Sequence, residues 1–219
     1  LGPNGAGKTT TILMLLGLTE PTKGTVSVCG FNPTIQPLEV KRRVGYLPEN
    51  PGFYEDLTAR ENLAYIARLN QIKQNRLDAL LHQGLDQVGL AADADRPVRE
   101  FSRGMKQRLG IAEVLVKEPE VIVLDEPTLG IDPDGVKRLL DLITKLQNER
   151  NLTVLLCSHL LHQVQMVCQR IGIIVNSRMI VQGSPGELGK AILQEHQWNF
   201  LVEVGNDYPL EEALSTLPG

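Results

Sequence analysis

The sequence lacks long apolar runs, a surplus of positive charge and a paired set of cysteines. No stretch approaches the roughly 18 apolar residues of a membrane-spanning helix, and the longest apolar runs, such as 121–124 and 171–175, have the length of buried strands. This chain alone is therefore not expected to span a membrane. Its 26 acidic residues outnumber its 22 basic residues, for a formal net charge of −4, which argues against a surface that binds nucleic acid.

The three cysteines, Cys29, Cys157 and Cys168, are odd in number and widely separated. Cys29 and Cys157 lie in apolar, strand-like contexts, which favours buried thiols in a reducing compartment. No two of the three have the spacing of metal ligands, so we expect no thiolate metal site.

A glycine-rich segment with a lysine and two threonines opens the chain. Residues 2–9 match the pattern G-x-x-x-x-G-K-T, and an apolar stretch at 12–18 that can continue as a helix follows. Glycines let the backbone curl so that several N–H groups face phosphate oxygens, and the helix N-terminus adds its positive dipole end. Lys8 is then expected to reach the β- and γ-phosphates, and Thr9 to coordinate Mg²⁺. The predicted phosphate-binding residues are Gly2, Pro3, Asn4, Gly5, Ala6, Gly7, Lys8, Thr9 and Thr10.

The order of the predicted elements is that of a parallel α/β sheet. Strands are predicted at 25–29, 43–47, 121–124, 153–157, 171–175 and 179–182. Helices are predicted after the loop, after a capping box at Thr58, along a leucine stripe at 77–88, after Asp132 and at 160–169. We predict a nucleotide-binding core from residues 1–52 and 118–194 and a helical subdomain at 53–117. Residues 195–219 are expected to begin a C-terminal extension, with a strand at 198–204 and a short helix at 210–217.

Two carboxylates follow the apolar run at 121–124. In an enzyme with a phosphate loop, a carboxylate at the tip of a neighbouring strand holds Mg²⁺, usually through water, and Asp125 fits that role. Glu126 would point elsewhere, towards a water that attacks the γ-phosphate, and could act as its general base. Four apolar residues before Asp-Glu are a weak motif, and a lone match is a chance one about half the time. Together with the loop at 2–9, the pair becomes a strong indication of a nucleotide site.

Residues 101–109 indicate a second anion-binding helix terminus. Ser102 can cap a helix that buries Met105 and Leu109, and a serine and a glycine, Gly104, lie at its tip. Taken alone, the segment favours an ordinary capped surface helix over an anion-binding one by roughly two to one.

Together these motifs resemble the ATP-binding subunits of ABC transporters, over nearly the whole chain. Residues 2–9 resemble the Walker A loop, and 121–126 the Walker B strand. Residues 102–105 lie where the family signature falls, 128–132 resemble the D-loop, and His159 matches the switch histidine.

The resemblance implies a RecA-like P-loop NTPase core with a helical insertion, ATP as the substrate and Mg²⁺ as the cofactor. Two such domains pack head to tail in the family, so Ser102 and Gly104 would contact the γ-phosphate bound by a partner chain. Lys8 would supply charge, Glu126 would act on the water and His159 would contact the γ-phosphate. ATP-driven closure of the pair would then power a membrane exporter.

The same resemblance implies two protein partners and no nucleic acid. One is a multi-span membrane permease, which would hold the chain at the cytoplasmic face of the cell membrane as a peripheral subunit. The other is a second ATP-binding subunit, identical or different. The surface that contacts the permease is expected near residues 49–63, beside the helical subdomain.

Three departures from the family pattern point to the ABC-2 type exporter ATPases. The signature is Phe-Ser-Arg-Gly-Met in place of Leu-Ser-Gly-Gly-Gln, so that Arg103 adds positive charge. The position of the usual metal-binding glutamine carries Glu49, whose carboxylate can also bind Mg²⁺. The D-loop contains Leu129-Gly130-Ile131-Asp132 in place of the commoner Ser-Gly-Leu-Asp.

The family places a strand and an adenine-stacking aromatic residue before the loop, and only Leu1 precedes it here. We therefore expect the sequence to be an N-terminally truncated fragment that folds poorly and binds ATP weakly by itself.

Competing functions fit the sequence less well. ABC-type ATPases of DNA repair carry long heptad insertions between the Walker motifs, and 58–88 is too short for one. Related translation factors carry two cassettes in a chain, whereas one is present here. A nucleotide switch with little turnover is disfavoured by Glu126 and His159, and a GTPase by the absence of an Asn-Lys-x-Asp segment. The transported substrate is not encoded in these motifs.

Overall fold

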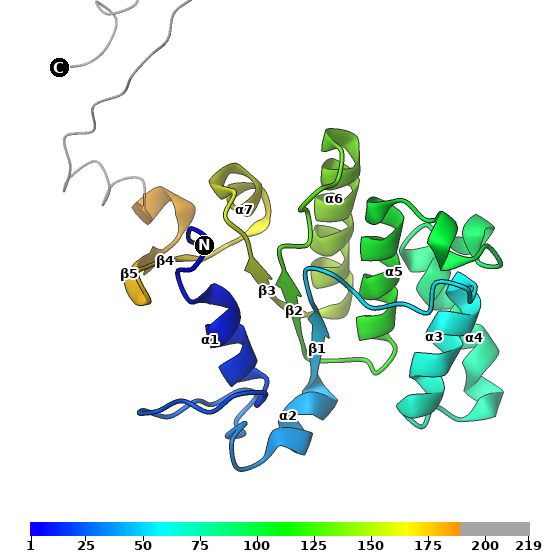
Figure 1. Ribbon diagram of the computed structural model, residues 1–219, viewed down its shortest axis with the longest axis horizontal. Helices are drawn as coiled ribbons and strands as arrows, with labels where there is room; N and C mark the ends of the chain where they lie inside the picture. Colours follow the sequence, from blue (N-terminus) through cyan, green and yellow to red (C-terminus); the bar gives the residue numbers. More distant parts are fainter. Residues whose placement is uncertain (189–219) are drawn as a thin grey trace, which may run out of the picture.

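The computed structural model describes residues 1–188 and has a three-stranded parallel sheet at its centre (Figure 1). The strands are β1 (Val44–Leu47), β2 (Val121–Asp125) and β3 (Thr153–Cys157), in the order β1-β2-β3. Leu47 pairs in register with Leu124, and Asp125 with Cys157. The carboxyl ends of all three strands therefore meet at one edge, where side chains from distant parts of the sequence come together.

Helices and a hairpin surround this sheet. The helices are α1 (Lys8–Leu15), α2 (Pro37–Arg43), α3 (Ala59–Leu69), α4 (Gln74–Gln87), α5 (Arg103–Leu115), α6 (Pro133–Arg150) and α7 (Leu161–Val167), with short 3-10 turns at Ala91–Asp93 and Val98–Glu100. The hairpin joins β4 (Ile171–Val175) to β5 (Arg178–Gly183). None of the helices within residues 1–188 is both long enough and apolar enough to cross a bilayer.

Strand β2 is apolar throughout because both of its faces are covered. Ile122 and Leu124 pack into a cluster with side chains of α5 and α6. Val123 points the other way and packs with Ile12 and Leu16 from α1 and the turn that follows it. Alternate residues of a strand face opposite sides, so an uninterrupted apolar run is what a central, doubly covered strand requires.

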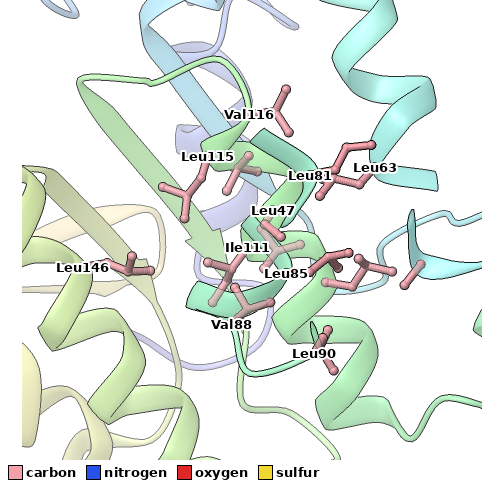
Figure 2. Packing of buried hydrophobic residues seen from close by; sticks show 14 of the residues in the cluster. Leu47, Leu63, Leu81, Leu85, Val88, Leu90, Ile111, Leu115, Val116 and Leu146 are labelled. Atoms are coloured by element: carbon pink, nitrogen blue, oxygen red, sulfur yellow. The ribbon is translucent and has the colours of Figure 1, made fainter. Parts of the chain in front are cut away.

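Helices α3, α4 and α5 form a bundle beside the sheet, and its core is continuous with that of the sheet. Thr58 and Glu61 form a capping box that starts α3. Figure 2 shows Leu63, Leu81 and Leu85 from this bundle near Leu47 of β1. A Cβ on Gly110 of α5 would lie only 2.4 Å from Leu47 Cδ1, so the helix that carries the predicted signature motif lies directly against β1. We propose that residues 53–117 form the helical subdomain on this basis.

The α/β prediction is confirmed, but two of its details are wrong. The predicted strand at 25–29 is absent, and in its place Val28 and Phe31 form one isolated antiparallel bridge. Within residues 1–188 no other strand lies alongside this segment, and an unpaired strand has no stable form. The strands at 171–175 and 179–182 do form, but as the antiparallel hairpin β4–β5 in a sheet of its own. The elements predicted at 198–204 and 210–217 lie outside the described residues.

The hairpin β4–β5 holds the glycine-rich loop in place. Leu1 N donates to Gly172 O and Ile174 N donates to Leu1 O, both at 2.8 Å. A Cβ on Gly2 would lie 2.2 Å from Ile174 O, so only glycine fits at this close approach. A groove of about 800 Å³ lies between β4 and β3. Within residues 1–188, β4 is hydrogen-bonded to Leu1 and β5 and not to the parallel sheet.

Glu113 on α5 makes the stability of the fold depend on pH. Burial raises the pKa of its carboxyl from 4.5 to about 8. The unfolded carboxyl loses its proton at a lower pH than the folded one, so stability falls as pH rises from about 4.5 to 8. We expect Glu113→Gln to raise the free energy of unfolding by roughly 1–3 kcal/mol at pH 8 and to change little at pH 4.

Urea unfolding of the wild type, Glu113→Gln and the exposed control Glu149→Gln at both pH values measures this difference. An equal effect of Glu113→Gln at pH 4 and pH 8 would show that packing, not ionisation, is responsible.

Candidate active site

The glycine-rich loop leaves the N-terminus of α1 open to a negatively charged ligand. Gly5 and Gly7 have φ values of 78° and 92°, in the left-handed region that favours glycine. Gly7 is the N-cap of α1 and provides no side-chain hydrogen bond, and the first turn holds no acidic residue. Helix N-termini have free N–H groups and a positive dipole end. The loop predicted at 2–9 thus has the geometry of a phosphate cradle.

Lys8 lies over this loop and beside a carboxylate. Its Nζ donates to Gly2 O at 2.7 Å and to Pro3 O at 3.1 Å. The same Nζ lies 3.6 Å from Glu126 Oε1, and the two side chains are only 9% and 10% exposed. The lysine is therefore already positioned where the loop would hold phosphate, with its charge balanced by Glu126.

Asp125 ends β2 with one oxygen bonded and the other free. Thr9 Oγ1 donates to Asp125 Oδ2 at 3.1 Å, across 116 positions of sequence. Asp125 Oδ1 is buried and has no hydrogen-bond partner among residues 1–188. Oxygen ligands from a carboxylate and a hydroxyl suit Mg²⁺. An unpartnered carboxylate oxygen next to the Thr9 hydroxyl therefore fits a metal ion at this place.

Cys157 is the register partner of Asp125 on β3. Burial, reinforced by the neighbouring carboxylate of Asp125, raises the pKa of its thiol to about 12. The thiol is therefore neutral at physiological pH and adds no negative charge beside Asp125, in keeping with the buried thiol predicted from the sequence.

Glu126 lies between Lys8 and His159. Its φ of 47° turns the chain sharply after β2, and its backbone N donates to Cys157 O at 2.9 Å. Its Oε2 lies 2.9 Å from His159 Nδ1. Asp125 and Glu126 are adjacent in sequence, but the turn gives them different partners. A left-handed conformation is costly for a glutamate.

Glu49 is not joined to this group in residues 1–188. Its Oε1 accepts from the neighbouring Asn50 Nδ2 at 3.5 Å, and its backbone O accepts from Gln107 Nε2 on α5 at 2.9 Å. The backbone bond holds the end of β1 against α5. The role of Glu49 as a metal ligand stays a prediction.

Helix α5, which Ser102 caps and which contains Gly104, lies on the opposite side of the sheet from α1 (Figure 1). Ser102 Oγ accepts from Met105 N at 3.2 Å and caps α5, as the sequence predicts. Within the described residues no hydrogen bond or ion pair links Ser102 or Gly104 to the loop. One chain therefore does not bring its signature motif to its own phosphate cradle.

Two contacts of residues 128–130, which resemble the D-loop, were not predicted. The side chain of Arg103 lies over Gly130, because a Cβ on Gly130 would be 3.0 Å from Arg103 Cδ. The positive charge of Arg103 is expected from the sequence, but this contact with the D-loop is not. Gln163 on α7 accepts a hydrogen bond from Thr128 Oγ1 at 2.5 Å, with both residues buried. Nothing in the sequence signals this pair, whose members are 35 residues apart.

The sequence model of the family described as ABC transporter matches residues 1–129, which include the glycine-rich loop and both carboxylates of the site. The chain belongs to the ABC transporter family. This family assignment agrees with the resemblance drawn from the motifs and with the α/β fold.

Individual ABC transporter proteins are similar over most of the chain. The bacitracin transport ATP-binding protein BcrA of Bacillus licheniformis is 46% identical over 82% of this chain and 58% of its own length. The Nod factor export ATP-binding protein I of Burkholderia pseudomallei is 40% identical over 87% of this chain and 62% of its own length. A solved ATP-binding subunit of an ABC transporter has a TM-score of 0.74 at 31% identity, over 88% of this chain and 80% of that one.

The chain thus spans 58% of the length of BcrA. Family and fold are established by these matches, whereas the roles of single residues in this ABC transporter protein remain predictions.

Proposed function

We propose that the chain is the ATP-hydrolysing subunit of an ABC exporter, with Mg²⁺ as its cofactor. The observation that carries the proposal is the position of Glu126, with Lys8 on one side and His159 on the other. Beside them, Thr9 and Asp125 offer the oxygen atoms that would hold the metal. Phosphoryl transfer needs charge neutralisation, an oriented water and little else from the protein, and these residues supply those parts.

Each residue has a distinct part in the proposed reaction. Lys8 and the N–H groups at the start of α1 would hold the phosphates. Glu126 would accept a proton from the water as its oxygen bonds to the γ-phosphorus and the bond to the ADP oxygen breaks. His159 would contact the γ-phosphate and keep Glu126 oriented through its 2.9 Å contact. Mg²⁺, when bound, would neutralise negative charge on the phosphates.

We propose that a second ATP-binding subunit completes the site. The cradle and the signature helix α5 lie on opposite sides of the sheet (Figure 1). Two chains packed head to tail would place Ser102 and Gly104 of one chain against the ATP bound by the other. The free N–H groups at the start of α5 would then face a phosphate.

We also propose that the subunit works with a multi-span permease, as a peripheral protein at the cytoplasmic face of the membrane. The support comes from relatives: BcrA is a bacitracin transport protein and the Burkholderia protein a Nod factor export protein. Export of a substrate by this chain's complex is inferred from them, and the substrate itself is left open.

The test of the proposed function is ATP hydrolysis by the complete gene product, measured as release of inorganic phosphate. We expect turnover with Mg²⁺ and none with excess EDTA, because Lys8 alone does not neutralise the charge of the phosphates and the metal held by Thr9 and Asp125 would supply the remaining positive charge. Absence of ATP turnover at micromolar protein, or equal turnover with and without EDTA, would contradict the proposal.

An exposed aromatic pair on the helical subdomain is the surface we propose for the permease. Tyr54 and Tyr65 are 53% and 40% exposed, and their rings pack edge to face at 5.1 Å. Leu69, one turn further along α3, is 61% exposed. Tyr54 belongs to the region predicted at 49–63, and Tyr65 and Leu69 extend it along α3. Exposed aromatic side chains that lie together are typical of protein interfaces.

We expect Leu69→Glu and Tyr65→Glu to reduce co-purification of the permease from detergent-solubilised membranes by at least about tenfold, because a carboxylate is costly to bury in an apolar contact. ATP turnover of the ATP-binding subunit alone should not change. Ile35→Glu, at an exposed apolar position outside this surface, is the control. Equal recovery of the permease with all three variants would place the interface elsewhere.

A further inference from the structure

A buried hydrogen bond connects the D-loop to the helix that follows the switch histidine. Thr128 Oγ1 donates to Gln163 Oε1 at 2.5 Å, and the two residues are 4% and 6% exposed. Thr128 begins the D-loop, and Gln163 lies in the first turn of α7, four residues after His159. Buried side-chain hydrogen bonds are strong constraints, because neither group has water as an alternative partner.

This bond is the last of three that join the same two segments. Glu126 N donates to Cys157 O at 2.9 Å, and Glu126 Oε2 lies 2.9 Å from His159 Nδ1. The Thr128–Gln163 bond follows in the same order along both segments. Residues 126–128 and 157–163 are therefore connected at the backbone, at the proposed catalytic pair and at the start of the D-loop.

On its other side, the D-loop contacts the signature helix. Arg103 of α5 lies over Gly130, where a Cβ would be 3.0 Å from Arg103 Cδ. The φ of 70° at Gly130 is also in the region that favours glycine. The D-loop ends at Asp132, whose side chain accepts from Gly135 N and caps α6. A displacement of Thr128 would thus reach the signature helix through residues 128–130. Gln163 is the contact that joins this path to His159.

We propose that Gln163 is a positioning residue for ATP hydrolysis: by holding Thr128, it fixes the D-loop and the signature helix relative to His159 and Glu126. The inference rests on the proposed function, and Gln163 itself touches neither ATP nor water in it. Its amide suits the task, because a neutral acceptor can be buried beside a threonine at lower cost than a carboxylate. Without it, Glu126 and His159 would keep their own contact and Leu129 N its bond to Glu126 O, but the start of the D-loop would no longer be bonded to α7.

The test compares Gln163→Met, which keeps the length of the side chain but removes the acceptor, with Thr128→Val, which removes the donor. Steady-state ATP turnover by the complete gene product is measured for each, for the double variant and for the conservative Thr128→Ser. The exposed Gln165→Met on the same helix is the matched control.

We expect each single variant to lower kcat roughly tenfold while KM for ATP stays within about twofold. The double variant should be no slower than either single one, since both remove the same bond. Thr128→Ser and Gln165→Met should keep wild-type kcat. This pattern is specific to positioning, because a purely structural bond would lower thermal stability and the active fraction without changing kcat per folded molecule.

Several outcomes would overturn the inference. They are kcat within twofold of wild type in both single variants, additive losses in the double variant, or losses that follow the unfolded fraction seen by circular dichroism. The proposed function fails separately, because in that case the wild type itself shows no Mg²⁺-dependent turnover.

Discussion

Replacement of Glu126 by glutamine is expected to slow ATP hydrolysis by roughly 10²–10⁴-fold, the range that a general base contributes. Glutamine keeps the shape of the side chain and can still hydrogen-bond His159 Nδ1, but it cannot accept a proton from water. The contacts of Lys8 with Gly2 O and Pro3 O do not involve Glu126, so the phosphate cradle should remain intact. ATP affinity should therefore be retained, and the loss should appear in kcat.

Phosphate release in single-turnover experiments measures the rate of hydrolysis, and equilibrium binding of a fluorescent ATP analogue measures the affinity for ATP. Glu149→Gln, at an exposed position on α6, is the matched control for the chemical change. Because an unhydrolysed nucleotide stabilises whichever state binds it, the Glu126→Gln protein should also accumulate with ATP as a two-chain species in size-exclusion chromatography. Wild-type turnover by Glu126→Gln would remove this residue from the role of base.

Much of the fold could be predicted because local patterns and tertiary burial agree. The apolar run at 121–124 forms β2, because a short strand covered on both faces buries consecutive apolar residues. The capping box at Thr58 started α3 as expected, because it satisfies backbone N–H groups locally. The strand predicted at 25–29 failed because pairing depends on a neighbour rather than on the alternation of its own residues.

The residues of the site likewise divide into those that a local motif predicts and those that depend on tertiary packing. Lys8, Asp125 and Glu126 could be predicted because each belongs to a short motif at the end of a strand or the start of a helix. Their meeting point follows from the parallel register, which aligns the carboxyl ends of the strands. The bond between Thr128 and Gln163 could not be predicted, because it depends on how α7 packs after β3. The same holds for Arg103, whose placement over Gly130 requires the relative position of two separate elements.

A mixture of two inactive variants is expected to recover activity if the site is completed by a second copy of the chain. Glu126→Gln disables the cradle side of a site, and Gly104→Asp disables the signature side by placing a negative charge where a γ-phosphate would bind. Gly104 is in the first turn of α5, where an acidic residue favours the helix, and a Cβ there would only touch Ile131 at 3.4 Å. Gly104→Asp should therefore fold and remain able to pair.

Each variant alone pairs with itself and has no intact site. In a mixed pair, the cradle of the Gly104→Asp chain meets the signature of the Glu126→Gln chain, and that one site is intact. Random exchange makes about half of the pairs mixed, each with one working site of two, so the mixture should reach roughly a quarter of wild-type turnover if the sites act independently. The specific activity should fall on dilution, because pairing depends on concentration.

Phosphate release from the separate variants and from their equimolar mixture, over a dilution series, gives the answer in one experiment. A mixture as inactive as its components, beside an active wild type, would show that two copies of this chain do not share a site. An active Gly104→Asp variant by itself would mean that the start of α5 does not contact the nucleotide. Recovery in the mixture would show that two chains share a site, because pairs of a single variant lack one half of every site.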